Sequence, residues 1–369
     1  MSGPARLLAG SEALAAAMVA AGCRFFAGYP MTPFTEVLES MAARLPEAGG
    51  ICMNAESELE AIGMCWGAAA TGTRAATGST GQGLALMQES LAEMTLARLP
   101  LVVLNMARGQ GDYFQTTRGG GHGDYRLPVL APSDVPEAVA HISLAFEWAE
   151  AWRTPVMVLG DYYLAHTHQS VAIPQGPQGP EGTSQGALAR PGWALNGSSG
   201  GTGRAKLVSP LGTAKQRDGL GGQAGYDLAV HYRACAERTE AMLHAIPPRV
   251  ESMFLDDAEL VVVGYGTPAK YLRAAVRELR STGARIGFVR PVTLVPFPYA
   301  EIARRVRGAR AVAVYENNTG QAVQDVRLAV NGALPVEFIG GLSMDPSGFG
   351  IAPDLDVRVL RERITEVAT

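Results

Sequence analysis

Three acidic residues near the start of the chain, Glu56, Glu58 and Glu60, could take part in proton transfer. Because residues two apart in a helix face different directions, the three carboxylates do not share one helix face. Glu58 heads a segment that is otherwise apolar, so its carboxyl group could be buried. A buried carboxyl group holds its proton more tightly and can act as an acid or a hydrogen-bond donor. The alternative is that Glu58 is only a favourable negative charge in the first turn of a helix.

Thr32 and Arg108 are candidates for binding an anion. We expect a helix to begin with Thr32 as N-cap and Pro33 at its first position, which would offer free backbone N–H groups and a hydroxyl to a carboxylate or phosphate. Arg108 follows an apolar run that reads as a strand, and ligands of parallel sheets bind at the carboxyl ends of strands. Its guanidinium group suits a carboxylate. The simpler interpretations are a plain helix cap and a surface ion pair.

Two glycine-rich segments could let the backbone approach a ligand closely. Residues 78–83 are expected to form a turn between a strand and a helix, and they include Gly81, Gln82 and Gly83. Residues 119–125 include His122, but no residue at ligand or catalytic-triad spacing accompanies this histidine. The second segment could equally be only a mobile loop.

A third glycine-rich segment, residues 264–269, resembles a dinucleotide-binding motif because it follows an apolar run and opens a helix. Pro268 intrudes into this motif. The acidic residue that the motif needs about 20 residues further on is also missing. Nucleotide binding at this segment is therefore a minor alternative.

Apolar runs alternate with helical segments along most of the chain, which predicts an α/β fold. The runs are continuous rather than alternating, as in a parallel sheet that helices cover on both faces. We expect strands at residues 23–27, 73–77, 101–104, 155–159, 260–263, 286–289, 311–314 and 336–339. We expect helices at residues 11–21, 58–70, 84–97, 269–281, 300–306 and 322–330, and one that begins at Thr32.

The length of 369 residues suggests two or three domains. Residues 174–230 hold 14 glycines and 5 prolines with few apolar residues, a composition that cannot form a packed core. We therefore expect one doubly wound domain over residues 1–172, a Gly/Pro-rich linker and arm over 173–250, and a second doubly wound domain over 251–369.

Composition excludes several classes of function. The net charge of −4 argues against nucleic acid as the main partner, because phosphate binding needs a basic face. The four cysteines (Cys23, Cys52, Cys65 and Cys235) form no close pair, so this chain should build neither an iron–sulfur cluster nor a structural zinc site in the usual spacing. We find no run of 18 apolar residues and no signal-peptide pattern, and expect a cytoplasmic protein without metal sites.

Longer stretches of the chain resemble the α subunits of 2-oxoacid:ferredoxin oxidoreductases of the pyruvate:ferredoxin oxidoreductase superfamily, most of all the 2-oxoisovalerate (branched-chain) type. The matching stretches are residues 21–33 (AGCRFFAGYPMTP), 55–58 (AESE), 67–72 (GAAATG), 110–115 (QGDYFQ), 119–126 (GGGHGDYR), 290–298 (RPVTLVPFP) and 320–327 (GQAVQDVR). The resemblance covers nearly the whole chain apart from the Gly-rich linker.

The resemblance implies a pyrimidine-binding domain of a thiamine-diphosphate enzyme, followed by a domain like the transketolase C-terminal domain. It implies a separate β subunit that carries the diphosphate and Mg²⁺ site with a [4Fe–4S] cluster, and further γ- and δ-type subunits with ferredoxin-like clusters. In this chain the pair Asn317–Asn318 resembles the end of a thiamine-diphosphate magnesium motif, but the Gly-Asp-Gly that should precede it is absent. The reaction implied is oxidative decarboxylation of a 2-oxoacid to an acyl-coenzyme A, with electrons passing to ferredoxin.

The resemblance also implies roles for single residues. Glu58 matches the catalytic carboxyl group that hydrogen-bonds N1′ of the aminopyrimidine, and Thr32 and Arg108 match contacts to the substrate carboxylate. The remaining cofactor-binding residues implied are Tyr29, Pro30, Gly81, Gln82 and Gly83.

The chain departs from the family pattern at two places beside the expected active site. Relatives carry a longer insertion between the position of Arg108 and the QGDY stretch, and a Ser-rich turn at residues 78–82. The shorter segment after Arg108 supports a second hypothesis. In this hypothesis the chain is a subunit that has lost catalysis and serves as a scaffold for assembly of the complex.

Overall fold

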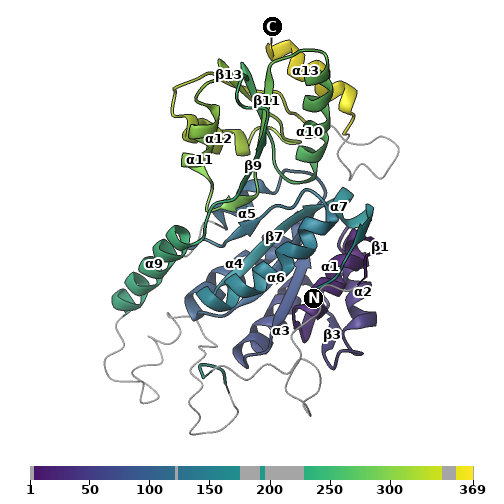
Figure 1. Ribbon diagram of the computed structural model, residues 1–369. Coiled ribbons are helices and arrows are strands. Elements are labelled where there is room, and N and C mark those ends of the chain that lie inside the picture. The colour runs from purple at the N-terminus through teal and green to yellow at the C-terminus, as the bar shows by residue number, and fades with distance from the viewer. Residues whose placement is uncertain (1–3, 121–123, 175–191, 196–227, 343–354, 369) are drawn as a thin grey trace.

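A computed structural model describes residues 4–120, 124–174, 192–195, 228–342 and 355–368 (Figure 1). These residues form two α/β parts. The N-terminal part is built around a seven-stranded sheet, and the part that begins near residue 250 is built around a five-stranded sheet. The expected fold class, α/β with two wound domains, is confirmed. The division of the chain at residues 172 and 250 stays a prediction.

The larger sheet has the strand order β12-β6-β7-β5-β4-β2-β3. All its neighbouring strands run parallel except β12 and β6. Its strands are β2 (Phe25–Gly28), β3 (Ile51–Asn54), β4 (Ala75–Ser79), β5 (Leu101–Ala107), β6 (Val129–Leu130), β7 (Pro155–Asp161) and β12 (Thr293–Val295). The central strands β5 and β7 are buried along their whole length, which explains why they read as continuous apolar runs.

Helices cover both faces of this sheet (Figure 1). The helices of the N-terminal part are α1 (Gly10–Ala20), α2 (Thr35–Arg44), α3 (Glu58–Ala70), α4 (Gly81–Ala97), α5 (Tyr113–Arg118), α6 (Val135–Trp152) and α7 (Tyr162–His166). One core joins α1, α2 and α6 to the sheet through residues such as Leu14, Met41 and Phe146. A second core joins α3 and α4 to the other face through Ile62 and Leu91. A small antiparallel pair, β1 (Arg6–Ala9) and β8 (His168–Val171), lies beside this body.

The smaller sheet has the strand order β14-β13-β10-β11-β9, and only β9 runs antiparallel to its neighbour. Its strands are β9 (Val250–Met253), β10 (Leu260–Val263), β11 (Ile286–Pro291), β13 (Ala311–Val314) and β14 (Val336–Phe338). The helices of this part are α10 (Gly266–Ser281), α11 (Tyr299–Val306), α12 (Ala322–Val330) and α13 (Val357–Ala368). Residues of α10 and α13 share one core, and residues of α11 and α12 share the other.

Two elements connect the parts in ways that the sequence did not suggest. The strand β12 leaves the C-terminal part and pairs with β6, with Thr293 opposite Leu130. The helix α9 (Leu228–Ala245) lies within the range expected to be a linker, and in Figure 1 it projects to one side below the C-terminal part.

One expected helix start is wrong. The helix after β2 begins at Thr35, not at Thr32, and Phe34 occupies its N-cap position. Thr32 instead lies in the connection before the helix. The expected turn at 78–83 is also shorter than predicted, because β4 extends through Ser79 and α4 begins at Gly81.

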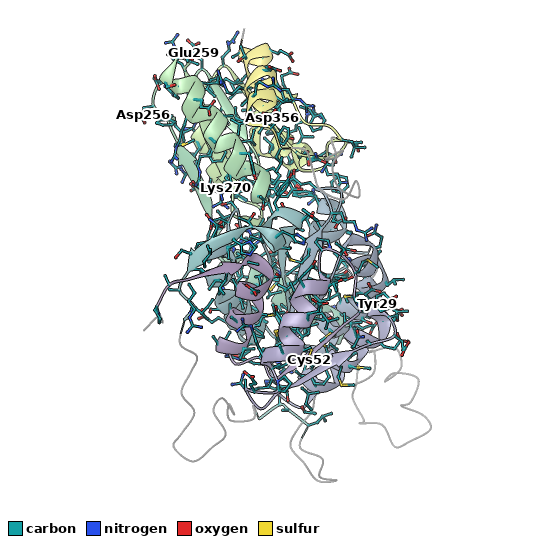
Figure 2. The ribbon with its side chains drawn as sticks, turned by 90° about the vertical axis from the view of Figure 1, so that its right-hand side faces the viewer. Tyr29, Cys52, Asp256, Glu259, Lys270 and Asp356 are labelled. Atoms are coloured by element: carbon teal, nitrogen blue, oxygen red, sulfur yellow. The ribbon has the colours of Figure 1, made fainter. Side chains whose placement is uncertain are left out.

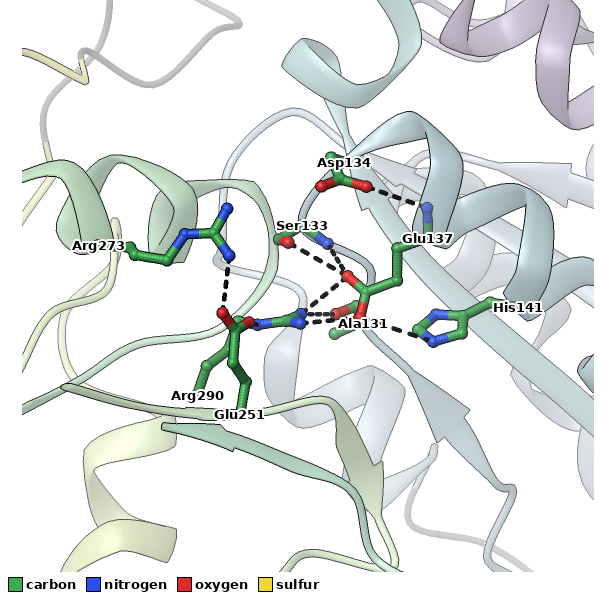
Figure 3. A network of polar contacts seen from close by, with 8 residues as sticks. All are labelled: Ala131, Ser133, Asp134, Glu137, His141, Glu251, Arg273 and Arg290. Carbon is green, nitrogen blue, oxygen red and sulfur yellow. Dashed lines mark hydrogen bonds and ion pairs between the residues drawn. The ribbon is translucent and has the colours of Figure 1, made fainter. Parts of the chain in front are cut away.

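Arg290 at the end of β11 connects the two parts through a network of charges (Figure 3). It is 4% exposed and donates hydrogen bonds of 2.8 and 3.0 Å to the carboxylate of Glu137 on α6. Its Nε donates to Glu251 on β9 at 2.7 Å, and Arg273 binds the other oxygen of Glu251. Burial acts to raise the pKa of both carboxyl groups, but both pKa values lie below their usual range. Arg290 lowers the pKa of Glu137, and Arg273 followed by Arg290 lowers the pKa of Glu251.

We predict that Arg290→Met lowers the free energy of unfolding by about 3–5 kcal/mol, because it leaves two partly buried carboxylates without their shared cation. Denaturant unfolding monitored by circular dichroism measures the change. The control is Arg304→Met, which removes an exposed arginine paired with Glu301 and should change stability little. Equal effects of the two variants would contradict the role given to Arg290.

His141, one turn after Glu137, makes the stability sensitive to acid. Burial lowers the pKa of His141 to about 4, and Glu137 opposes this shift. Between pH 6.5 and about 4 the unfolded chain therefore binds a proton that the folded chain does not, so stability falls as the pH falls. We predict that His141→Leu flattens this part of the curve of unfolding free energy against pH. A slope equal to that of the unaltered protein would show that His141 does not titrate in this way.

Candidate active site

The sequence-predicted residues gather at one edge of the larger sheet. Because β2, β4 and β5 are parallel neighbours, their carboxyl ends lie side by side. The connection after β2 carries Tyr29, Pro30 and Thr32, the start of α4 after β4 carries Gly81–Gly83, and Arg108 follows β5. Tyr29 is labelled on the N-terminal part in Figure 2, together with Cys52 of the adjacent strand β3.

Glu58 is the first residue of α3 and is 2% exposed. Its Oε1 accepts a hydrogen bond of 2.7 Å from the hydroxyl of Ser79, the last residue of β4. Its Oε2 makes no hydrogen bond within the described part of the chain. The carboxyl group is thus removed from water, fixed on one side and open to a ligand on the other. This is the buried carboxyl group that the sequence predicted.

Glycines make room for this carboxyl group. A Cβ atom at Gly83 would collide with the hydroxyl of Ser79 and with Oε1 of Glu58. A Cβ atom at Gly81 would collide with the carboxylate of Asp112. Both positions therefore require glycine for close packing, and α4 can begin directly beside Glu58 only because they lack side chains.

Thr32 and Arg108 are brought together, as the prediction of a shared anion site requires. Nε of Arg108 donates a hydrogen bond of 3.1 Å to the backbone carbonyl of Thr32. Thr32 is exposed and Arg108 is half-buried, so both can be reached from solvent. The hydrogen bond uses one guanidinium N–H and leaves the Nη groups of Arg108 available for an anion.

The connections after β2 and β4 also touch each other. The hydroxyl of Thr80 lies 2.7 Å from Sδ of Met31 and donates to Oε1 of Gln82 at 3.0 Å. Gln82 itself is exposed, as is Pro30, while Tyr29 is half-buried. These contacts connect the two segments that flank the candidate anion site.

Two site residues were missed by the sequence reasoning, Ser79 and Asp112. Asp112 is half-buried, its Oδ2 accepts a hydrogen bond of 3.2 Å from Asn105, and burial raises its pKa while Asn105 opposes the shift. The sequence contains a feature that could have pointed to Asp112. Asn105 is the only amide in the otherwise apolar run of β5. A buried polar side chain in such a strand needs a partner, and that partner is Asp112.

Two segments of the C-terminal part that resemble cofactor-binding motifs, residues 264–269 and the pair Asn317–Asn318, have structural roles. Nε2 of Gln110 donates to the carbonyl oxygen of Tyr265, and the carbonyl oxygen of Gln110 accepts from Asn318. The cavity beside Tyr265 and Gly266 measures about 10 Å³, which is room for no more than one water molecule. This cavity is far too small for a dinucleotide.

Exposed apolar side chains occur on the helix that Glu58 begins, on the helix α4 that packs against it and on the strand β3 that precedes it. We define the apolar face as five exposed side chains on β3, α3 and α4: Ile51, Met53, Leu59, Met64 and Leu86. Their exposed fractions range from 37% to 55%. Clusters of exposed apolar side chains are typical of contact surfaces for other chains.

Metal sites and membrane-spanning helices are both absent from the described residues. No group of three or more His, Cys, Asp or Glu side chains is arranged there to hold a metal ion. No helix among them is long and apolar enough to cross a membrane. His122 lies outside the described residues.

Comparison with known proteins identifies two family models in the chain. The model described as pyruvate flavodoxin/ferredoxin oxidoreductase, thiamine diphosphate-binding, matches residues 16–184. The model described as pyruvate:ferredoxin oxidoreductase core domain II matches residues 258–346. The two matches correspond to the two α/β parts of the structure.

Curated relatives cover nearly the whole chain. Ketoisovalerate oxidoreductase subunit VorB of Methanothermobacter thermautotrophicus is 32% identical over 98% of this chain and 98% of its own length. 2-oxoglutarate synthase subunit KorA of Methanothermobacter marburgensis is 32% identical over 89% of this chain and 92% of its own.

Solved structures share the fold. A 2-oxoglutarate:ferredoxin oxidoreductase from Magnetococcus marinus, solved with 2-oxoglutarate, coenzyme A and succinyl-CoA, gives a TM-score of 0.79 at 23% identity. The match covers 99% of this chain but 66% of that longer chain. A split-gene transketolase, in an inactive β4 tetramer, gives 0.57 at 13% identity over 98% of both chains. From the two family models and the near full-length relatives, the chain belongs to the family of 2-oxoacid:ferredoxin oxidoreductase subunits.

Proposed function

We propose that this chain is the α subunit of a thiamine-diphosphate-dependent 2-oxoacid:ferredoxin oxidoreductase. The enzyme would convert a 2-oxoacid and coenzyme A into an acyl-coenzyme A and CO₂, with the two electrons passing to ferredoxin in the cytoplasm. The observation that carries the proposal is the buried carboxyl group of Glu58, which Ser79 holds at the carboxyl edge of the sheet.

The residues around Glu58 fit the aminopyrimidine of the coenzyme. One carboxyl oxygen is occupied by Ser79 and the other makes no hydrogen bond among the described residues, so it can bind a ring nitrogen. Gly81 and Gly83 place no side chain against Asp112 and Glu58 at the start of the adjacent helix. Bound thiamine diphosphate would supply the carbon nucleophile and the electron sink for decarboxylation. Glu58 would hold the proton at its hydrogen bond to N1′, and Tyr29, Pro30 and Gln82 would border the ring.

The second half of the coenzyme site is proposed to belong to a β subunit. The sequence lacks the Gly-Asp-Gly motif that binds the diphosphate through Mg²⁺, and its four cysteines lack cluster spacing. The apolar face beside Glu58 supports a partner chain at this position, because burial of its five side chains would stabilise an interface. We propose that the β subunit carries Mg²⁺ and a [4Fe–4S] cluster, and that γ- and δ-type subunits complete the complex.

Thr32 and Arg108 are proposed to bind the carboxylate of the 2-oxoacid. The guanidinium group of Arg108 supplies the positive charge, and its hydrogen bond to the carbonyl of Thr32 fixes its direction. The neighbouring side chains Tyr29, Pro30 and Met31 are aromatic or apolar, which favours a branched or aryl 2-oxoacid over 2-oxoglutarate. The relatives act on both types by name, so a substrate panel with the purified complex decides between them.

The first test of this function is Glu58→Gln in the complex with the β subunit. Glutamine keeps an oxygen for the hydroxyl of Ser79 but cannot hold the proton, so we expect the rate of viologen reduction with 2-oxoacid and coenzyme A to fall about 10²–10⁴-fold. The control is Glu60→Gln, an exposed carboxylate in the same helical turn, which should leave the rate unchanged. Activity within a few-fold of the unaltered enzyme in Glu58→Gln would refute the proposed role.

The second test is Arg108→Gln in the same complex. Loss of a charge-assisted hydrogen bond costs about 1.5–3 kcal/mol, so the KM for the 2-oxoacid should rise roughly 10–100-fold while thiamine-diphosphate affinity stays the same. Arg277→Gln, an exposed change on α10, serves as the control. An unchanged KM in Arg108→Gln would place the carboxylate elsewhere.

A further inference from the structure

Three arginines gather at the edge of the larger sheet opposite the candidate active site. Arg98 caps the C-terminus of α4 and Arg153 caps the C-terminus of α6, so both precede the amino end of a strand. Nε of Arg153 donates a 3.0 Å hydrogen bond to the carbonyl of Arg98. Arg238, from α9, donates a 2.7 Å hydrogen bond to the carbonyl of Thr95 on α4. We call Arg98, Arg153 and Arg238 the arginine cluster.

Among the residues that the structure describes, no carboxylate neutralises the charges of the arginine cluster. Within the described residues, none of the three guanidinium groups forms an ion pair with Asp or Glu. Nε of Arg98 and Nη1 of Arg238 are buried and have no hydrogen-bond partner in that part of the chain. Buried N–H groups of charged side chains are normally satisfied, so these two mark a place where an acceptor is missing.

Electrostatics inside the arginine cluster are unfavourable. Burial and then the positive charge of Arg98 lower the pKa of Arg238 to about 10, with Arg153 acting in the same direction. Burial and Arg98 also lower the pKa of Arg153. Three cations that repel one another in a partly buried place would each be favoured by a bound anion.

The backbone adds an independent observation. Arg98 and Arg153 both adopt left-handed conformations, with φ of 58° and 49°. Glycine is the ordinary residue at such a helix end, because a side chain there is strained. Both helix ends therefore carry an arginine where glycine is usual, and the hydrogen bond from Arg153 to the carbonyl of Arg98 joins them.

We propose that the arginine cluster is a binding site for the phosphoryl group of a small ligand. A phosphate carries nearly two negative charges and several acceptor oxygens, which match three guanidinium groups better than the single charge of a carboxylate does. The guanidinium of Arg153 also stacks on Trp193 at 4.6 Å, and Trp193 lines a cavity of about 460 Å³ with Leu101 and Phe146. An apolar or aromatic group of the same ligand would occupy this cavity.

Titration calorimetry of the full-length chain with inorganic phosphate and with phenyl phosphate tests the proposal. Both should bind at one site, and phenyl phosphate should bind more tightly because the cavity takes its ring. Arg238→Gln should weaken both at least tenfold. Arg233→Gln, an exposed arginine on the same helix, should leave binding unchanged. No saturable binding of phosphate, or equal binding to both variants, would overturn the site, and equal affinity for the two probes would overturn the role of the cavity.

Thermal unfolding separates this role from a purely structural one. Without phosphate, Arg238→Gln should be at least as stable as the unaltered chain, because a repelling charge is gone, and phosphate should raise the melting temperature of the unaltered chain only. A variant that is destabilised to the same extent with and without phosphate would show that Arg238 merely caps α4. Arg108→Gln should bind phosphate as tightly as the unaltered chain. Loss of binding in Arg108→Gln would show that the phosphate binds in the candidate active site and not at the arginine cluster.

Discussion

The hydrogen bond from Ser79 to the buried carboxyl group of Glu58 constrains most of the candidate active site. A carboxyl group can leave water only where polar neighbours replace the lost hydration. That replacement depends on the strand order, since β4 must lie beside β2 and close to the start of α3. It also depends on glycine at position 83, because any side chain there would occupy the place of the Glu58 carboxyl group. Burial of the Glu58 carboxyl group therefore requires both the order of the parallel strands and the glycine at position 83.

A second constraint comes from the way the C-terminal part packs on the segment after β5. The backbone N–H of Phe114 donates to Gln321, and the hydroxyl of Tyr113 donates to Asp325 at 2.6 Å. Asp325 is 1% exposed and also binds Arg118. The QGDYFQ and GQAVQDVR stretches thus contact each other, which explains their specific sequences without giving either a chemical role. By fixing the residues shortly after Arg108, this contact holds the edge of the candidate active site in place.

The sequence allowed prediction of those elements whose signal is local. The strand at Leu260–Val263 and the helix at Ala322–Val330 have the predicted bounds, because each is a continuous apolar run or an amphipathic segment with clear ends. The strands β6 and β12 have two and three residues and depend on pairing between distant segments, so no local pattern marks them. Thr32 was misplaced because Thr-Pro resembles a helix start, whereas the structure begins the helix at Thr35.

The two edges of the larger sheet differ in charge because of the direction of its helices. Helix N-termini lie at the carboxyl edge, where their partial positive charge favours a carboxylate such as Glu58. Helix C-termini lie at the amino edge, where their partial negative charge favours cations such as Arg98 and Arg153. The dipoles account for Arg153 and Arg238, since each of these guanidinium groups donates to a carbonyl near the C-terminus of α4. They do not account for Nε of Arg98 and Nη1 of Arg238, which are buried and find no acceptor among the residues that the structure describes. These donors distinguish the proposed anion site from a set of helix caps.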